Sequence, residues 1–209
     1  NVALIASILG QWLKFSEKDI RILTISGLLH DIGKIMIPNE ILTKPGKLTV
    51  AEYNIMKQHV NFGYEKVKNQ NIDIRIKEAC LLHHEKCDGT GYPFGLKSDH
   101  IPAVAKIIAI ADVYDAMTSA RVYRGALCPF EVIDTMYKDA FTKFEPEYIL
   151  PFLKNVASSY INNDVRLSDG RIGKVVLINE NALSLPIVQC EDEFIDLSKT
   201  RELTVSAIL

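Results

Sequence analysis

The feature of this sequence that could do chemistry is a set of histidine and aspartate side chains that recur in separate segments of the chain. Imidazole and carboxylate groups together suit borderline divalent ions such as iron, manganese or zinc. Six such ligands exceed what one ion takes from protein, so we predict two ions, with Asp31 bridging them as two-metal hydrolytic sites require. The predicted metal ligands are His30, Asp31, His59, His83, His84 and Asp112.

Two other interpretations of these residues are open. A single histidine in a buried helix is more often a hydrogen-bonded core residue than a ligand, but burying four imidazoles without partners would be costly. The spacing of Cys80, His83, His84 and Cys87 would also permit a tetrahedral zinc site. That zinc site would leave the other four residues of the set without a role, so we favour the two-ion site.

Composition limits the class of protein. The chain has 209 residues, 48% of them hydrophobic, which suffices for one good-sized core or for a core with a small appendage. A formal net charge of -2 predicts no binding of a nucleic-acid polymer, and a small anionic ligand fits better. Four cysteines without a CxxC pair argue against disulfides and for a reducing compartment, so we expect a cytoplasmic location. The apolar runs are too short to span a membrane.

Apolar periodicity predicts a mainly α fold, an all-helical bundle of about seven helices followed by a small β appendage. The first helical pattern already includes the first residues, so an N-terminal extension is expected to be missing. We predict a helical domain over 1–162 and the β appendage over 163–209. The expected helices cover residues 2–12, 18–29, 49–68, 72–84, 102–117, 129–142 and 146–160, and the expected strands cover 165–167, 174–178, 186–190 and 194–197.

Cationic side chains near the predicted ligands could bind phosphate. Lys34 follows His30 and Asp31 by one helical turn, so its ammonium could hold a non-bridging phosphate oxygen, although a solvated lysine is the alternative. Arg121 and Arg124 could bind a second phosphate or a guanine edge, and surface ion pairing is nearly as plausible.

A glycine-rich loop follows the histidine pair. Gly89 and Gly91 could let backbone amides approach an anion, or could simply permit left-handed turns. Tyr92 then leads out of the loop. Glu85 and Asp88 could orient the ligand imidazoles through hydrogen bonds.

The stretches LLHDIGK (28–34), HHEKCDGTGYP (83–93) and DVYDAMT (112–118), together with His59, resemble one known family. The sequence is similar to the HD-GYP domain, a bacterial subclass of the HD phosphohydrolases, over about residues 1–155. The resemblance is specific, because two long motifs occur in the family's order and at suitable separations.

The resemblance implies a helical HD fold, a di-iron or di-manganese centre and hydrolysis of cyclic di-GMP to linear pGpG or GMP. It implies that the six predicted ligands bind the metals, with Asp31 bridging, and that Lys34 lies near the scissile phosphate. Gly91 and Tyr92 lie in the signature loop, which could bind substrate or a protein partner. Some members hold a third metal through residues that would precede Asn1.

The expected reaction is attack on phosphorus by a hydroxide that bridges the two metals, in line with the leaving ribose oxygen. The alternative is a catalytically weak signalling module that binds a cyclic dinucleotide or docks a diguanylate cyclase. Family members are often attached to sensory or receiver domains, which are therefore possible partners. The β appendage could pack on the helical body, extend a partner's sheet or support a homodimer.

Overall fold

The structure is a computed structural model, and it describes residues 1–119, 127–200 and 202–209. Helices α1 (Val2–Trp12) and α2 (Glu17–Leu29) form an antiparallel pair, with Ser16 capping α2 by accepting from the Asp19 N–H at 3.2 Å. Their packing is close, because a Cβ on Gly27 would lie 2.6 Å from the Cα of Ala3. The carboxyl end of α2 is therefore held firmly against the start of α1.

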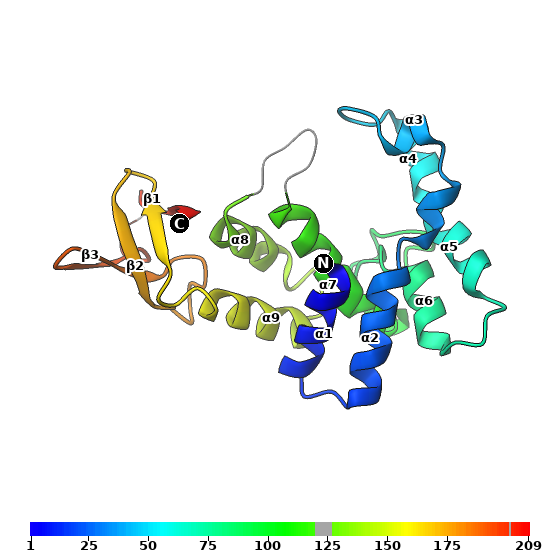
Figure 1. The fold of residues 1–209 in the computed structure, drawn as a ribbon, viewed down its shortest axis with the longest axis horizontal. Helices are drawn as coiled ribbons and strands as arrows, with labels where there is room; N and C mark the ends of the chain where they lie inside the picture. The colour runs from blue at the N-terminus through cyan, green and yellow to red at the C-terminus, as the bar shows by residue number, and fades with distance from the viewer. Residues whose placement is uncertain (120–126, 201) are drawn as a thin grey trace.

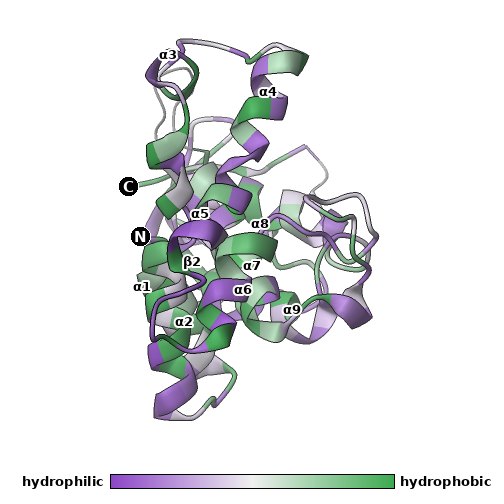
Figure 2. Cartoon of the chain, turned by 90° about the vertical axis from the view of Figure 1, so that its right-hand side faces the viewer, coloured by the Kyte–Doolittle hydropathy of each residue, from purple (hydrophilic) through white to green (hydrophobic). Residues whose placement is uncertain are grey.

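After α2 the chain forms a 3-10 helix, η1 (Ile32–Met36), and then α3 (Asn39–Leu42), α4 (Val50–Lys57) and α5 (His59–Val67). Thr49 and Glu52 form the predicted capping box at the start of α4. The single helix expected over 49–68 is wrong, since the chain breaks at Gln58. There the Gln58 N–H donates to the Ile55 carbonyl at 3.0 Å, and the Met56 carbonyl accepts from the His59 ring at 2.8 Å. Figure 2 shows α3 and α4 standing away from the rest of the molecule.

The central element is α7 (Ala103–Thr118), which contacts α1, α2, α6, α8 and α9. Its buried residues are all apolar and lie between Val104 and Ala111. Around it pack α6 (Ile74–Leu82), α8 (Pro129–Asp139) and α9 (Pro146–Ser158), and η2 (Ser98–His100) precedes it. None of the helices in the described ranges is long and apolar enough to cross a bilayer.

A small antiparallel sheet follows the helices, at the end of the molecule opposite α3 and α4 (Figure 1). The strand order is β4-β3-β2-β1-β5. The sequence predicted four of these strands and missed the last, which pairs with β1 rather than with its neighbour in the chain. The strands are β1 (Asp164–Leu167), β2 (Ile172–Leu177), β3 (Ile187–Cys190), β4 (Glu193–Asp196) and β5 (Val205–Ile208).

Helices and sheet share one hydrophobic core. Buried side chains of the sheet, such as Val165 and Val188, belong to the same cluster as Phe130 on α8 and Phe152 on α9. The mainly α fold with a C-terminal β part is thus confirmed, and the sheet packs on the helical body. The division of the chain into two domains at residue 162 stays a prediction.

Candidate metal centre

The structure brings all six predicted ligands together. In each of two groups, every residue offers one ligand atom that lies within 4.8 Å of the others, and Asp31 belongs to both groups. One group consists of Asp31, His59, His83 and His84, and the other consists of His30, Asp31 and Asp112.

Helix ends position most of these side chains. His30 is the residue that caps α2 and His83 the one that caps α6, while His59 begins α5 rather than lying inside a longer helix. Glycine allows the segments to meet: a Cβ on Gly33 would lie 1.9 Å from the carbonyl oxygen of His59. The backbone just after Asp31 is therefore in direct contact with the start of α5.

Backbone carbonyls orient three of the imidazoles. Nδ1 of His30 lies 2.8 Å from the Gly27 oxygen, and Nδ1 of His59 lies 2.8 Å from the Met56 oxygen. Nδ1 of His83 similarly lies 2.9 Å from the carbonyl of Ala79. A carbonyl can only accept, so Nδ1 must carry the proton in each ring. In the neutral form of each ring, Nε2 then offers a lone pair, which is the arrangement that metal-binding histidines need.

These nitrogens and one carboxylate oxygen crowd together without a donor between them. Nε2 of His59 lies 3.3 Å from Nε2 of His83, and Oδ1 of Asp31 lies 3.3 Å and 3.8 Å from these two nitrogens. Within the described ranges, Asp31 Oδ1 and His30 Nε2 are buried and have no hydrogen-bond partner. Acceptors facing one another repel, and a cation between them removes that cost. The residues present therefore fit a bound metal.

The protonation equilibria of His59, His83 and His84 agree with that fit. Burial lowers the pKa of His59, pushes that of His83 well below its ordinary value and brings that of His84 to about 4, so these rings are neutral at pH 7. Burial also disfavours the charged form of His30, but Asp112 and Asp31 outweigh it and raise the pKa of His30 to about 9. His30 is therefore protonated at pH 7 when no metal is bound, and a cation between these carboxylates would have to displace that proton.

The cysteine-based zinc site is wrong. Cys80 is buried and its thiol donates to the Leu29 carbonyl at 3.3 Å. The Cys87 N–H donates to the Lys143 carbonyl, and neither cysteine belongs to either candidate ligand group. The four cysteines are all free thiols.

The signature loop folds back on the histidine pair. Gly91 has no room for a side chain, since a Cβ would lie 2.6 Å from the His84 oxygen and 2.5 Å from the Cα of Glu85. The ring of Tyr92 stacks on that of His84, with centroids 4.7 Å apart and planes at 29°. Gly91 is therefore needed for close backbone packing, and its substrate contact stays a prediction. Gly89, with φ of 82°, does adopt the left-handed turn.

Glu85 has a different role from the one expected. Its carboxylate, only 4% exposed, accepts from the N–H groups of Phe94, Gly95 and Leu96 at 2.7, 3.1 and 2.9 Å. Asp88 accepts from Thr90. Both acids thus hold the loop rather than the imidazoles, and the expectation that they orient the ligands is wrong.

A cavity of about 680 Å³ adjoins the centre and is lined by His59, His84 and Tyr92 on one side. Lys34 lines it too, with Nζ 2.5 Å from Oδ2 of Asp31. The sequence analysis did not assign a role to the other polar and aromatic side chains of this cavity, although two of them lie within the motif at 83–93. They are Lys44, Tyr53, Lys86 and Thr90. Arg121 and Arg124, the other predicted phosphate-binding residues, lie outside the described residues.

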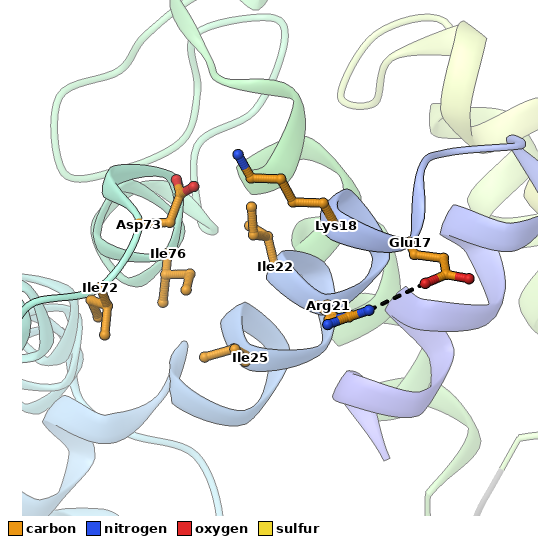
Figure 3. Close-up of a pocket in the computed structure, with 8 residues that line it drawn as sticks. All are labelled: Glu17, Lys18, Arg21, Ile22, Ile25, Ile72, Asp73 and Ile76. Carbon is orange, nitrogen blue, oxygen red and sulfur yellow. Dashed lines mark hydrogen bonds and ion pairs between the residues drawn. The ribbon is translucent and has the colours of Figure 1, made fainter.

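A second groove, of about 550 Å³, lies between α2 and α6 (Figure 3). Its apolar part is formed by four isoleucines, Ile22, Ile25, Ile72 and Ile76. Charged side chains surround them, and among these Arg21 forms an ion pair with Glu17. No histidine or cysteine lines it, so this groove does not repeat the ligand chemistry of the centre around Asp31.

Comparison with known proteins identifies the family. The family described as "HD domain" matches residues 1–148. The chain belongs to the HD domain family. It is 41% identical over 155 residues to the cyclic di-GMP phosphodiesterase response regulator RpfG of Xanthomonas campestris pv. campestris, covering 73% of this chain and 41% of that protein. It is also 37% identical over 182 residues to a cyclic di-GMP phosphodiesterase of Pseudomonas aeruginosa, covering 87% of this chain and 44% of that protein.

A solved structure shares the fold of this HD domain. The HDG"Y"P protein Bd1817 from Bdellovibrio bacteriovorus aligns with a TM-score of 0.60 and 22% identity, covering 72% of this chain and 48% of that one. The HD-GYP assignment made from the sequence motifs is confirmed. The chain spans less than half the length of the two curated relatives.

Proposed function

We propose that this HD domain hydrolyses a phosphodiester bond of cyclic di-GMP, releasing linear pGpG or GMP, with two divalent metal ions, iron or manganese. The observation that carries the proposal is the place of Asp31 in both ligand groups. A shared carboxylate is what two closely spaced ions need, whereas a structural site for one ion would not require it. The names of the curated relatives support cyclic di-GMP as the substrate.

In the proposed site Asp31 would help to hold both ions, because its two oxygens face different histidines. Oδ1 faces His59 and His83, and Oδ2 lies 3.2 Å from Nε2 of His30, which in turn lies 3.7 Å from Oδ1 of Asp112. When bound, such ions activate water at neutral pH and neutralise charge on the phosphoryl group. The protein holds their ligands rigidly through the carbonyl contacts of the imidazoles, so little reorganisation is needed.

Lys34 is the proposed phosphate-binding residue. Its ammonium lies at the boundary between the centre and the cavity, where it pairs with Asp31. A phosphate that enters the cavity brings a non-bridging oxygen to which the same ammonium can donate. Tyr92, which also lines the cavity, keeps the His84 ring in place by stacking on it.

Metal content and turnover in two aspartate variants test this proposal. Purified protein is loaded anaerobically with iron or manganese, its metal is counted by mass spectrometry, and products from cyclic di-GMP are separated by chromatography. Asp31→Asn should lose both ions and at least about 100-fold in turnover, and Asp112→Asn should lose mainly one ion. Asp192→Asn, at an exposed position in the turn between β3 and β4, is the control. Full turnover by a folded Asp31→Asn protein would reject the mechanism.

A non-catalytic signalling role is the second candidate. Phe94, in the signature loop, is 62% exposed although it is a large apolar side chain, which suits contact with a protein such as a diguanylate cyclase or an attached sensory or receiver domain. Binding of cyclic di-GMP without turnover in metal-loaded protein would favour this role. A homodimer and a cytoplasmic location also stay predictions.

A further inference from the structure

Helix α4 presents two side chains beside the candidate centre that the proposed reaction does not use. Tyr53 and Lys57 lie one helical turn apart, and Lys57 precedes His59 by two residues. The Tyr53 residue is 48% exposed and lines the 680 Å³ cavity together with His59 and His84. A ring that the protein leaves half uncovered in such a cavity offers a flat surface for a nucleobase.

Lys57 does not line the cavity itself, but its ammonium lies beside two rings that do. Its Nζ lies over two rings, 5.4 Å from the centroid of Tyr53 and 6.0 Å from that of Tyr92. Both distances are near the outer limit for cation–π attraction, roughly 6 Å, so these contacts hold the ammonium only weakly. The ammonium can therefore move to a stronger acceptor in the cavity.

The lysines of this region differ in what they already bind. Lys34 pairs with Asp31, and Lys44 donates to both carboxylate oxygens of Glu52 at 2.8 and 2.7 Å. For Lys57, no carboxylate within the described ranges lies close enough to form an ion pair. Its three N–H donors are thus left for a ligand.

A donor beside a stacking surface distinguishes the purines. Guanine presents two acceptors, O6 and N7, on one edge, whereas adenine presents N7 beside an amino group that is itself a donor. An ammonium can donate to both of these guanine atoms. It cannot donate to the adenine amino group, because that group is also a donor. We infer that Tyr53 and Lys57 form a guanine-selective subsite, in which Tyr53 stacks on the base and Lys57 donates to O6 and N7. This inference rests on the proposed function, since a dinucleotide with one phosphate at the centre delivers the base.

Base preference in metal-loaded variants tests the subsite. We would measure kcat/KM for cyclic di-GMP, cyclic di-AMP and 3'3'-cyclic GMP-AMP, and the Kd of GMP and of AMP by calorimetry. Lys57→Met should lower the GMP-over-AMP preference by roughly 10-fold, in line with the discrimination typical of a two-acceptor contact to guanine. Lys57→Arg should retain the preference, because arginine also donates to O6 and N7.

The tyrosine variant separates stacking from edge recognition. Tyr53→Ala should weaken GMP and AMP about equally, by roughly 10-fold, because stacking tolerates any base. Lys66→Met, at an exposed lysine on α5 that neither lines the cavity nor lies over the ring of Tyr53 or Tyr92, is the control for charge. An unchanged GMP-to-AMP ratio in Lys57→Met would overturn the subsite alone. Absence of turnover on every cyclic dinucleotide by the wild-type protein would instead overturn the proposed function, and the subsite with it.

Discussion

Replacing Glu85 with alanine removes the acceptor of three loop amides at once. Each hydrogen bond to a charged group contributes about 1.5–3 kcal/mol. The three do not add fully, because water reaches the loop around Phe94, which is 62% exposed, and can satisfy some of the freed N–H groups. We therefore expect Glu85→Ala to lower the free energy of unfolding by about 3 kcal/mol. In a chain of 209 residues this corresponds to a fall in Tm of roughly 6–12 °C.

Glu85→Gln should lower the free energy of unfolding by less, about 1.5 kcal/mol. The amide oxygen still accepts from the loop, while the amide NH₂ group faces a backbone N–H and the two donors cannot bond. Thermal and urea unfolding of the metal-free proteins would give both values. Glu147→Ala, an exposed position in the first turn of α9, is the matched control and should change stability by about 1 kcal/mol or less. If the free energy of unfolding of Glu85→Ala is within about 0.5 kcal/mol of that of the control, the loop does not depend on this carboxylate and our reasoning fails.

Three further predictions follow from the packing and the charges. Gly33→Ala should destabilise the fold by about 3 kcal/mol, since its Cβ would lie 1.9 Å from the His59 oxygen. Gly63→Ala is the control and should be tolerated, because the nearest non-local atom to its Cβ is 3.4 Å away. Unfolding curves of the two variants would show whether they differ in stability as expected. Arg75 lowers the pKa of Asp73 to about 2, so the ion pair stabilises the fold above about pH 4 and this stabilisation is lost as the pH falls towards 2. Arg75→Met should therefore flatten the dependence of the free energy of unfolding on pH between these values. An unaltered pH dependence would contradict this prediction. Chelation of bound metal should lower the Tm, measurable by calorimetry, because the facing acceptors lose their cation.

Local signals in the sequence predicted the helices and caps well, because these depend on residues within one or two turns. The capping box of Thr49 and Glu52 is an example. The break at Gln58 was not predicted, because the orientation of the His59 ring that accompanies it also depends on the distant residues Asp31 and His83, which face its Nε2. The strand β5 was missed because its partner, β1, lies far away in the chain.

The sequence by itself determined which six side chains could bind metal, since their residue types and motif order are local properties. Only the tertiary structure decided which atoms face one another, because the ligands come from α2, α5, α6 and α7 and meet through packing between distant segments. It placed Oδ1 of Asp31 near His59 and turned Glu85 away from the imidazoles toward the loop. It also placed the Lys57 ammonium over the ring of Tyr53, which lines the cavity beside the centre, and the subsite that we propose depends on this arrangement.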